Sequence, residues 1–265
     1  MTDKRLPKIR RSIKKTGRSR CALCRTEAKI ANSHIIPEFF YKSMYDGDNT
    51  YFGLSQNSKQ EDIRFDQGFR EDLLCCECEQ QFSKYEDYAC RVFYGGVEVG
   101  CVCQPGGVLL NGIDHRKFRL FLLSMLWRMG VAETAIFSKV ELGPFEEELR
   151  QMLRAEEPGI PDRFCWRIES VQLLGKKGNW HNPPDVAKVE CQRCYRVVID
   201  GFLFLFFVSR QTLPSALQDV CIKRDGTMAI PIRQIGDIPF LKDRALKLGK
   251  AMVERGTPWL ESKSL

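Results

Sequence analysis

The sequence CALC at residues 21–24, SHIIP at residues 33–37 and LLCCECEQQFSKYE at residues 73–86 decides how this chain is expected to fold. Two Cys-x-x-Cys pairs flank His34, and the second pair leads directly into a helical pattern. The start of the sequence lacks the apolar core of a secretory signal, so we expect a cytoplasmic protein with reduced thiols. Paired reduced cysteines favour one tetrahedral Zn²⁺ over disulfides. The expected ligands are Cys21, Cys24, Cys75 and Cys78.

Cys76 lies between the two cysteines of the second pair and competes for the same ion. Only Cys75 with Cys78 reproduces the two-residue gap that lets both sulfurs face one metal. The alternative is a group of buried free thiols. Because binding free energy at such a site is also folding free energy, we expect this region to unfold when the metal is removed.

The helix that follows the second pair is expected to be amphipathic. Its apolar stripe comprises Phe82, Tyr85, Ala89, Val92 and Phe93, and its solvated side comprises Lys84, Asp87, Tyr88 and Arg91. Glu79 and Glu86 are seven residues apart, so they lie nearly in line at the margin of the stripe. Carboxylates there can hold a hard divalent cation. The alternative is two solvated glutamates near a helix start, where the helix dipole favours negative charge.

The order of these motifs resembles the zinc-containing branch of the HNH endonucleases, the His-Me finger or treble-clef family, in particular its SHIIP-type bacterial members. The resemblance covers about residues 21–94 and implies a zinc-stabilised ββα-metal module that cuts nucleic acid. It implies that His34 is the general base that activates water. Glu79 stands where the family usually has histidine or asparagine, and Glu86 matches a further acidic position of some members. Zinc would be structural, and a second, exchangeable Mg²⁺ or Mn²⁺ would be catalytic. Roles in restriction or phage defence fit this resemblance.

Two positions differ from the pattern of many members of that family. Ser33 stands where many have an acidic ligand or a second histidine. The asparagine expected a few residues before the second cysteine pair is missing, because residues 69–73 read FREDL. A lone histidine among apolar neighbours is also often structural. Two alternatives to a nuclease therefore remain open. The first is a catalytically inactive treble clef that binds nucleic acid, and the second is an interaction protein in which zinc only stabilises the fold.

The positive charge of the chain is concentrated at its start. Of 41 basic and 34 acidic residues, nine basic and one acidic residue lie in residues 1–20. We expect a flexible basic arm that neutralises nucleic-acid phosphates, most simply those of DNA. The alternatives are a solubilising tail and a targeting peptide. The predicted nucleic-acid-binding residues are Lys4, Arg5, Lys8, Arg10, Arg11, Lys14, Lys15, Arg18 and Arg20.

Residues 96–265 predict a larger mixed α+β domain of unknown role, after a glycine-rich boundary. Residues 115–129 are apolar on almost every side, which indicates a buried helix whose Arg119 and Arg128 pair with acidic groups or reach the surface. Amphipathic helices are expected at residues 144–156 and 241–254, and strands at residues 164–174, 186–199 and 202–208. The last strand is apolar on both faces and should be central.

Three units are therefore predicted: an arm at residues 1–20, a zinc module at residues 21–95 and an α+β domain at residues 96–265. The apolar runs are too short to span a membrane, so we expect no membrane partner. A protein partner or a second copy of the chain would bind through the last unit.

Overall fold

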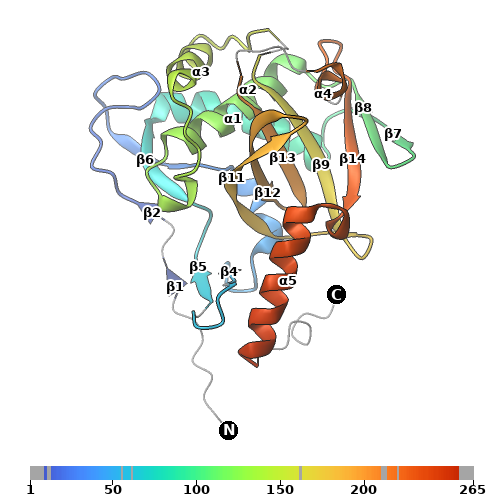
Figure 1. The fold of residues 1–265 in the computed structure, drawn as a ribbon. Coiled ribbons are helices and arrows are strands. Elements are labelled where there is room, and N and C mark those ends of the chain that lie inside the picture. Colours follow the sequence, from blue (N-terminus) through green and yellow to red (C-terminus); the bar gives the residue numbers. More distant parts are fainter. Residues whose placement is uncertain are drawn as a thin grey trace.

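The computed structural model describes residues 9–10, 13–54, 56–60, 62–160, 163–209, 214–219 and 221–256. The predicted mixture of helices and strands is confirmed (Figure 1). In the described part of the chain, no helix has both the length and the apolar composition needed to cross a lipid bilayer.

A small three-stranded sheet lies beside the first long helix. Strands β3 (Ile30–His34) and β6 (Arg70–Cys75) are antiparallel, and β2 (Ile13–Lys14) adds to β6 in parallel. Helix α1 (Cys76–Tyr94) follows β6 without a loop, because Cys75 is both the last strand residue and the helix N-cap. The register shifts between Ala31 and Asn32, next to the strand end that carries His34.

The connection from β3 to β6 contains short elements. The 3₁₀ turns η1 (Glu38–Phe40) and η2 (Lys42–Met44) follow Pro37, where the sequence predicts two helical turns. A second small sheet has the order β1-β5-β4, formed by β1 (Ile9–Arg10), β4 (Tyr51–Gly53) and β5 (Ile63–Phe65). Two short parts of the polar stretch before β6, residues 51–53 and 63–65, therefore pair with each other in this sheet.

The second half of the chain builds an eight-stranded sheet of order β11-β12-β13-β9-β14-β8-β7, with β10 paired to β9 (Figure 1). Its strands are β7 (Gly100–Gln104), β8 (Gly107–Asn111), β9 (Cys165–Leu173), β10 (Lys176–Lys177), β11 (His181–Val189), β12 (Gln192–Ile199), β13 (Phe202–Phe207) and β14 (Met228–Gln234). The other elements are α2 (His115–Val131), η3 (Ala135–Phe137), α3 (Pro144–Arg154), α4 (Ser215–Gln218), η4 (Ile235–Asp237) and α5 (Pro239–Glu254).

Strand β13 is central and buried on both faces, as its sequence predicts. Phe202, Phe204 and Phe206 face one hydrophobic cluster, to which α1 and α2 contribute, whereas the alternate residues face a second cluster with α4 and α5. A strand turns successive side chains to opposite faces, so an apolar residue is needed at every position. Helices thus cover both faces of this strand.

Three local expectations differ from the structure. Residues 186–199 form the end of β11 and all of β12, joined by a turn at Glu190 and Cys191 with φ of 48° and 64°. Two-residue hairpin turns with positive φ favour Asn and Gly, so this turn carries no sequence signal. Tyr88 was expected on the solvated side of α1, but its side chain is buried. Its hydroxyl accepts a hydrogen bond from the Asp114 N–H at 2.6 Å. The helix predicted at residues 115–129 extends to Val131 and includes Gly130.

The largest hydrophobic cluster runs across the predicted boundary between the zinc module and the second domain. Phe40 and Phe93 come from the first half, and their rings lie 5.5 and 6.1 Å from that of Phe204. Helix α1 also packs directly on α2. The core is therefore shared, and the division into two domains stays a prediction.

Replacing Phe204 by Ala should destabilise the whole chain, because its ring is fully buried between both halves. We expect a loss of about 3–5 kcal/mol in the free energy of unfolding, measured by urea denaturation. Leu174→Ala is the matched control, since Leu174 is 92% exposed. Two separate transitions, of which only one shifts, would contradict a shared core.

Candidate functional site

The four predicted cysteines converge on one point. One ligand atom from each of Cys21, Cys24, Cys75 and Cys78 lies within 4.8 Å of the other three. Three of the four side chains are buried and that of Cys24 is half-buried. Four clustered thiols are a donor set suited to a tetrahedral metal ion such as zinc. The predicted clustering is confirmed, and the identity of the metal stays a prediction.

Local backbone contacts hold the first cysteine pair against the sheet. The turn is closed by a hydrogen bond from the Arg25 N–H to the Cys21 carbonyl at 2.9 Å. The Ala22 N–H donates to the carbonyl of Leu73 in β6 at 3.0 Å, which brings the turn to the start of α1.

The thiols of the cluster interact with one another. A hydrogen bond with Cys78 lowers the pKa of Cys21 to about 4, and the same contact raises the pKa of Cys78. Cys76 takes no part, because its side chain is exposed and contacts Gln80 at 3.6 Å. Cys76 therefore does not compete with Cys75 and Cys78 for the same ion.

His34 ends β3 and lies opposite Arg70 in the antiparallel pairing with β6. Its side chain is 17% exposed, and two polar side chains reach the same ring nitrogen. The Glu38 Oε2 atom lies 2.5 Å from His34 Nε2, and Arg70 Nε lies 2.8 Å from it. Neither contact involves Nδ1.

Glu79 lies in the first turn of α1, close to β3. Burial raises the pKa of its carboxyl group. A hydrogen bond with Ser33 and the positive charge of Arg128 lower this pKa, but the effect of burial is larger. Its Oε1 atom is buried and accepts no hydrogen bond from any described residue. An unpartnered carboxylate oxygen inside a protein is costly, so this atom is the place where an added cation would be stabilising.

Glu86 has a different environment, because it forms an ion pair with a buried arginine from α2. Arg128 Nη2 lies 2.6 Å from Glu86 Oε1, and the Arg128 side chain is only 1% exposed. Arg128 Nη1 also donates to the backbone carbonyl of His34 at 2.7 Å. The expectation that this arginine pairs with an acid is confirmed, and one guanidinium joins α2, α1 and the end of β3.

The structure thus brings His34, Glu79 and Glu86 into one neighbourhood, since the charges of His34, Glu86 and Arg128 all act on Glu79. Sequence reasoning missed Glu38 and Arg70 as contacts of the histidine. Glu38 follows His34 by four residues, a spacing typical of helical contacts, but it lies beyond a proline. Arg70 is found only through strand pairing between distant segments.

The basic arm is only partly described. Lys4, Arg5, Lys8 and Arg11 lie outside the described residues, and Arg10 belongs to β1. Lys14 and Arg18 pair with Glu133 at 3.3 and 3.0 Å, and Arg20 donates to the Arg25 carbonyl at 3.0 Å. The side chain of Lys15 is exposed. The part of the arm next to the first cysteine is therefore held against the body of the protein, and nucleic-acid binding by these residues stays a prediction.

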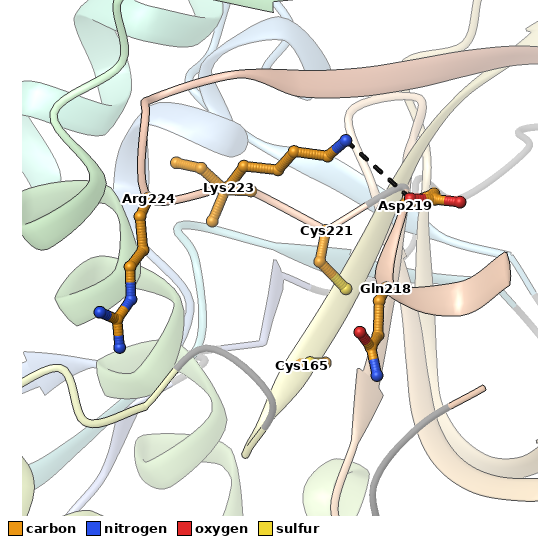
Figure 2. A pocket seen from close by; sticks show the side chains of 7 residues that line it. Cys165, Gln218, Asp219, Cys221, Lys223 and Arg224 are labelled. Carbon is orange, nitrogen blue, oxygen red and sulfur yellow. Dashed lines mark ion pairs between the residues drawn. The ribbon is translucent and has the colours of Figure 1, made fainter. Parts of the chain in front are cut away.

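A pocket lies elsewhere in the molecule, between the start of β9 and the segment after α4 (Figure 2). Figure 2 shows the sulfur of Cys221 pointing toward Cys165, with Lys223 and Asp219 paired at 3.9 Å on the other side of the chain. None of its lining residues belongs to the cysteine cluster or to the surroundings of His34.

We compared the chain with models of protein families, with curated proteins and with solved structures, and none of the three comparisons found a match.

Replacing Cys78 by Ser should abolish stoichiometric zinc binding and lower the melting temperature, because one buried sulfur of the cluster is lost. Zinc content by mass spectrometry and thermal unfolding measure the two effects. Cys76→Ser is the matched control, two residues away and exposed. Equal zinc content in both variants would show that the cluster is not the metal site.

Proposed function

We propose that this chain is a metal-dependent endonuclease of the HNH or His-Me finger type, which hydrolyses phosphodiester bonds in DNA. The arrangement of His34 at the end of β3 beside Glu79 of α1 carries the proposal. A general base and a carboxylate with a free, buried oxygen are the two parts that metal-assisted phosphodiester hydrolysis needs. The ribbon order of antiparallel strands β3 and β6 followed by α1 supports the ββα assignment (Figure 1).

The four-cysteine cluster completes this module as a treble clef in the proposal. Its thiolates hold one structural Zn²⁺ between the turn at residues 21–24 and the start of α1. With four sulfur donors the ion has no open position, so it stabilises the fold and does not touch the substrate.

His34 is the general base in this proposal. Glu38 and Arg70, the polar side chains of the described residues that reach its ring, both lie at Nε2, so Nδ1 is the nitrogen that accepts the proton of the attacking water. The hydrogen bond from Arg128 to the His34 carbonyl fixes the backbone that carries the ring. A Mg²⁺ or Mn²⁺ ion at Glu79 supplies, when bound, neutralisation of the charge that develops on the phosphate.

The two glutamates have separate roles in this proposal. Glu79 is the cation ligand, because its Oε1 has no hydrogen-bond donor among the described residues. Glu86 is neutralised by Arg128 and holds that arginine in place. DNA as the substrate, the basic arm as its binding segment, a cytoplasmic location, and a restriction or phage-defence role belong to the same proposal.

One observation favours a second candidate, a treble clef that binds nucleic acid without cutting it. A cation site formed by both glutamates is not available while the Arg128 guanidinium occupies Glu86. Ser33 adds no charge to the site. The two candidates differ only in cleavage, so an activity assay separates them.

Supercoiled plasmid should be nicked by the protein with Mg²⁺ or Mn²⁺ and not with EDTA, and His34→Ala should lower the rate by about 10²–10⁴-fold. His115→Ala is the matched control, because His115 lies at the start of α2 and the charges that act on it are those of Asp114, Arg119 and Arg224. Zinc content must be equal in all variants. DNA binding without nicking by the wild type would favour the binding module.

Glu79→Gln should raise the Mg²⁺ concentration needed for half-maximal nicking, since an amide oxygen binds a divalent cation more weakly than a carboxylate. The control is Glu77→Gln, in the same helix turn but exposed. Circular dichroism and zinc content check that both proteins fold. An unchanged metal dependence in Glu79→Gln would contradict a cation at this position.

A further inference from the structure

A hydrogen-bond acceptor and a hydrogen-bond donor both contact one ring nitrogen of His34. Glu38 Oε2, 2.5 Å from Nε2, requires a proton on that nitrogen, whereas Arg70 Nε, 2.8 Å from it, requires a lone pair. A neutral imidazole carries one N–H, so only one of the two contacts is a hydrogen bond at a time. The choice decides which ring nitrogen is free to accept a proton.

Of the two contacts, the hydrogen bond from the Nε2–H of His34 to the Glu38 carboxylate is the more favourable. Its Oε2 atom is buried and has no hydrogen bond from any described residue unless Nε2 carries the proton. Leaving that oxygen next to a nitrogen lone pair is unfavourable, because both would be acceptors. Arg70 has further N–H groups and acts on Glu38 by its charge, so it loses less when Nε2 is protonated.

The other carboxylate oxygen of Glu38 is already held. Tyr45 donates its hydroxyl hydrogen to Glu38 Oε1, and the same hydroxyl accepts from the Gly68 N–H at 3.0 Å. Although burial opposes ionisation, hydrogen bonds from His34 and Tyr45 lower the pKa of Glu38 overall. Glu38 is thus a fixed, charged acceptor.

We infer that Glu38 is a positioning residue that holds His34 in the tautomer with its proton on Nε2, so that Nδ1 is the free base. Glu38 also stabilises the imidazolium that forms when Nδ1 accepts a proton. The charged groups around the ring are Glu38 and Arg70 at Nε2, Arg128 at the backbone carbonyl, and Glu79 from α1. Arg70 then contributes charge near Glu38 and is not the partner of the ring.

This inference deepens the proposed function, since a base is useful only if the chain is a nuclease, but the tautomer can be measured without activity. The chain has three histidines, so long-range ¹H–¹⁵N spectra at a pH above the titration of the rings contain three sets of signals. The wild type should show His34 protonated at Nε2. In Glu38→Ala the Arg70 donor has no competitor, so the proton should move to Nδ1. His115 and His181 provide internal references.

Glu38→Gln is the second variant and keeps an acceptor oxygen without the charge. It should retain the wild-type tautomer and still lose nicking activity, on the order of 10-fold or more in kcat with little change in KM. Glu98→Ala, at an exposed glutamate, is the control and should change neither readout. A purely structural role of Glu38 would not move the proton between ring nitrogens.

The two measurements test the role of Glu38 and the nuclease activity separately. A tautomer shift in Glu38→Ala together with an inactive wild type would support the role of Glu38 and reject the nuclease. An active wild type in which Glu38→Ala keeps the proton on Nε2, or in which the wild type carries it on Nδ1, would overturn the role of Glu38 and leave the nuclease standing. If Glu38→Ala does not fold, a wild-type activity in Glu38→Gln would overturn it as well.

Discussion

The convergence of four thiols on one point is the constraint on which the rest of the site depends. It ties the turn at residues 21–24 to the junction of β6 and α1, fifty residues further along the chain. Cys75 pairs with Ile30 at the start of β3, so the cluster also fixes the register of the two strands. With the register and the helix start both fixed, His34 and Glu79 have defined places. A shift of one residue would turn His34 to the other face of the sheet.

A buried arginine connects this small module to the rest of the protein. The Arg128 side chain is inaccessible to solvent, and a charge in that position must be paired. Its partners are a glutamate of α1 and the backbone at the end of β3, so removing either side would leave an uncompensated charge. Glu71 adds a second connection, because its fully buried carboxylate accepts hydrogen bonds from the N–H groups of Glu133 and Thr134, just after α2. The second half of the chain therefore takes part in building the site.

Sequence patterns predict the parts of this structure that depend on local or repeated signals. The cysteine spacing identifies the cluster. The apolar runs identify α2 and the central β13, because an unbroken run of apolar residues indicates an element that is buried on all sides. The turn at Glu190 and Cys191 was missed because side chains there do not match its backbone conformation. Glu38 follows His34 by only four residues, but Pro37 between them hides the helical spacing. The contact of Arg70 with His34 depends on strand pairing across 36 residues, which no spacing rule contains. The ordered part of the basic arm was missed for the same reason: β2 is a strand only because β6 is beside it.

Three carboxylates lie near the histidine, and their surroundings give them different chemistry. Glu38 is charged, with the Tyr45 hydroxyl at one oxygen and the His34 ring nitrogen at the other. Glu86 is neutralised by the buried guanidinium of Arg128. Glu79 combines an Oε1 atom that has no donor among the described residues with a pKa raised by burial, although Ser33 and the charge of Arg128 act in the opposite direction. A cation bound there would stabilise the charged form and satisfy that oxygen together. Of the three carboxylates, Glu79 is thus the one whose environment a bound cation would complete, and this difference is the physical argument behind the proposed cation site.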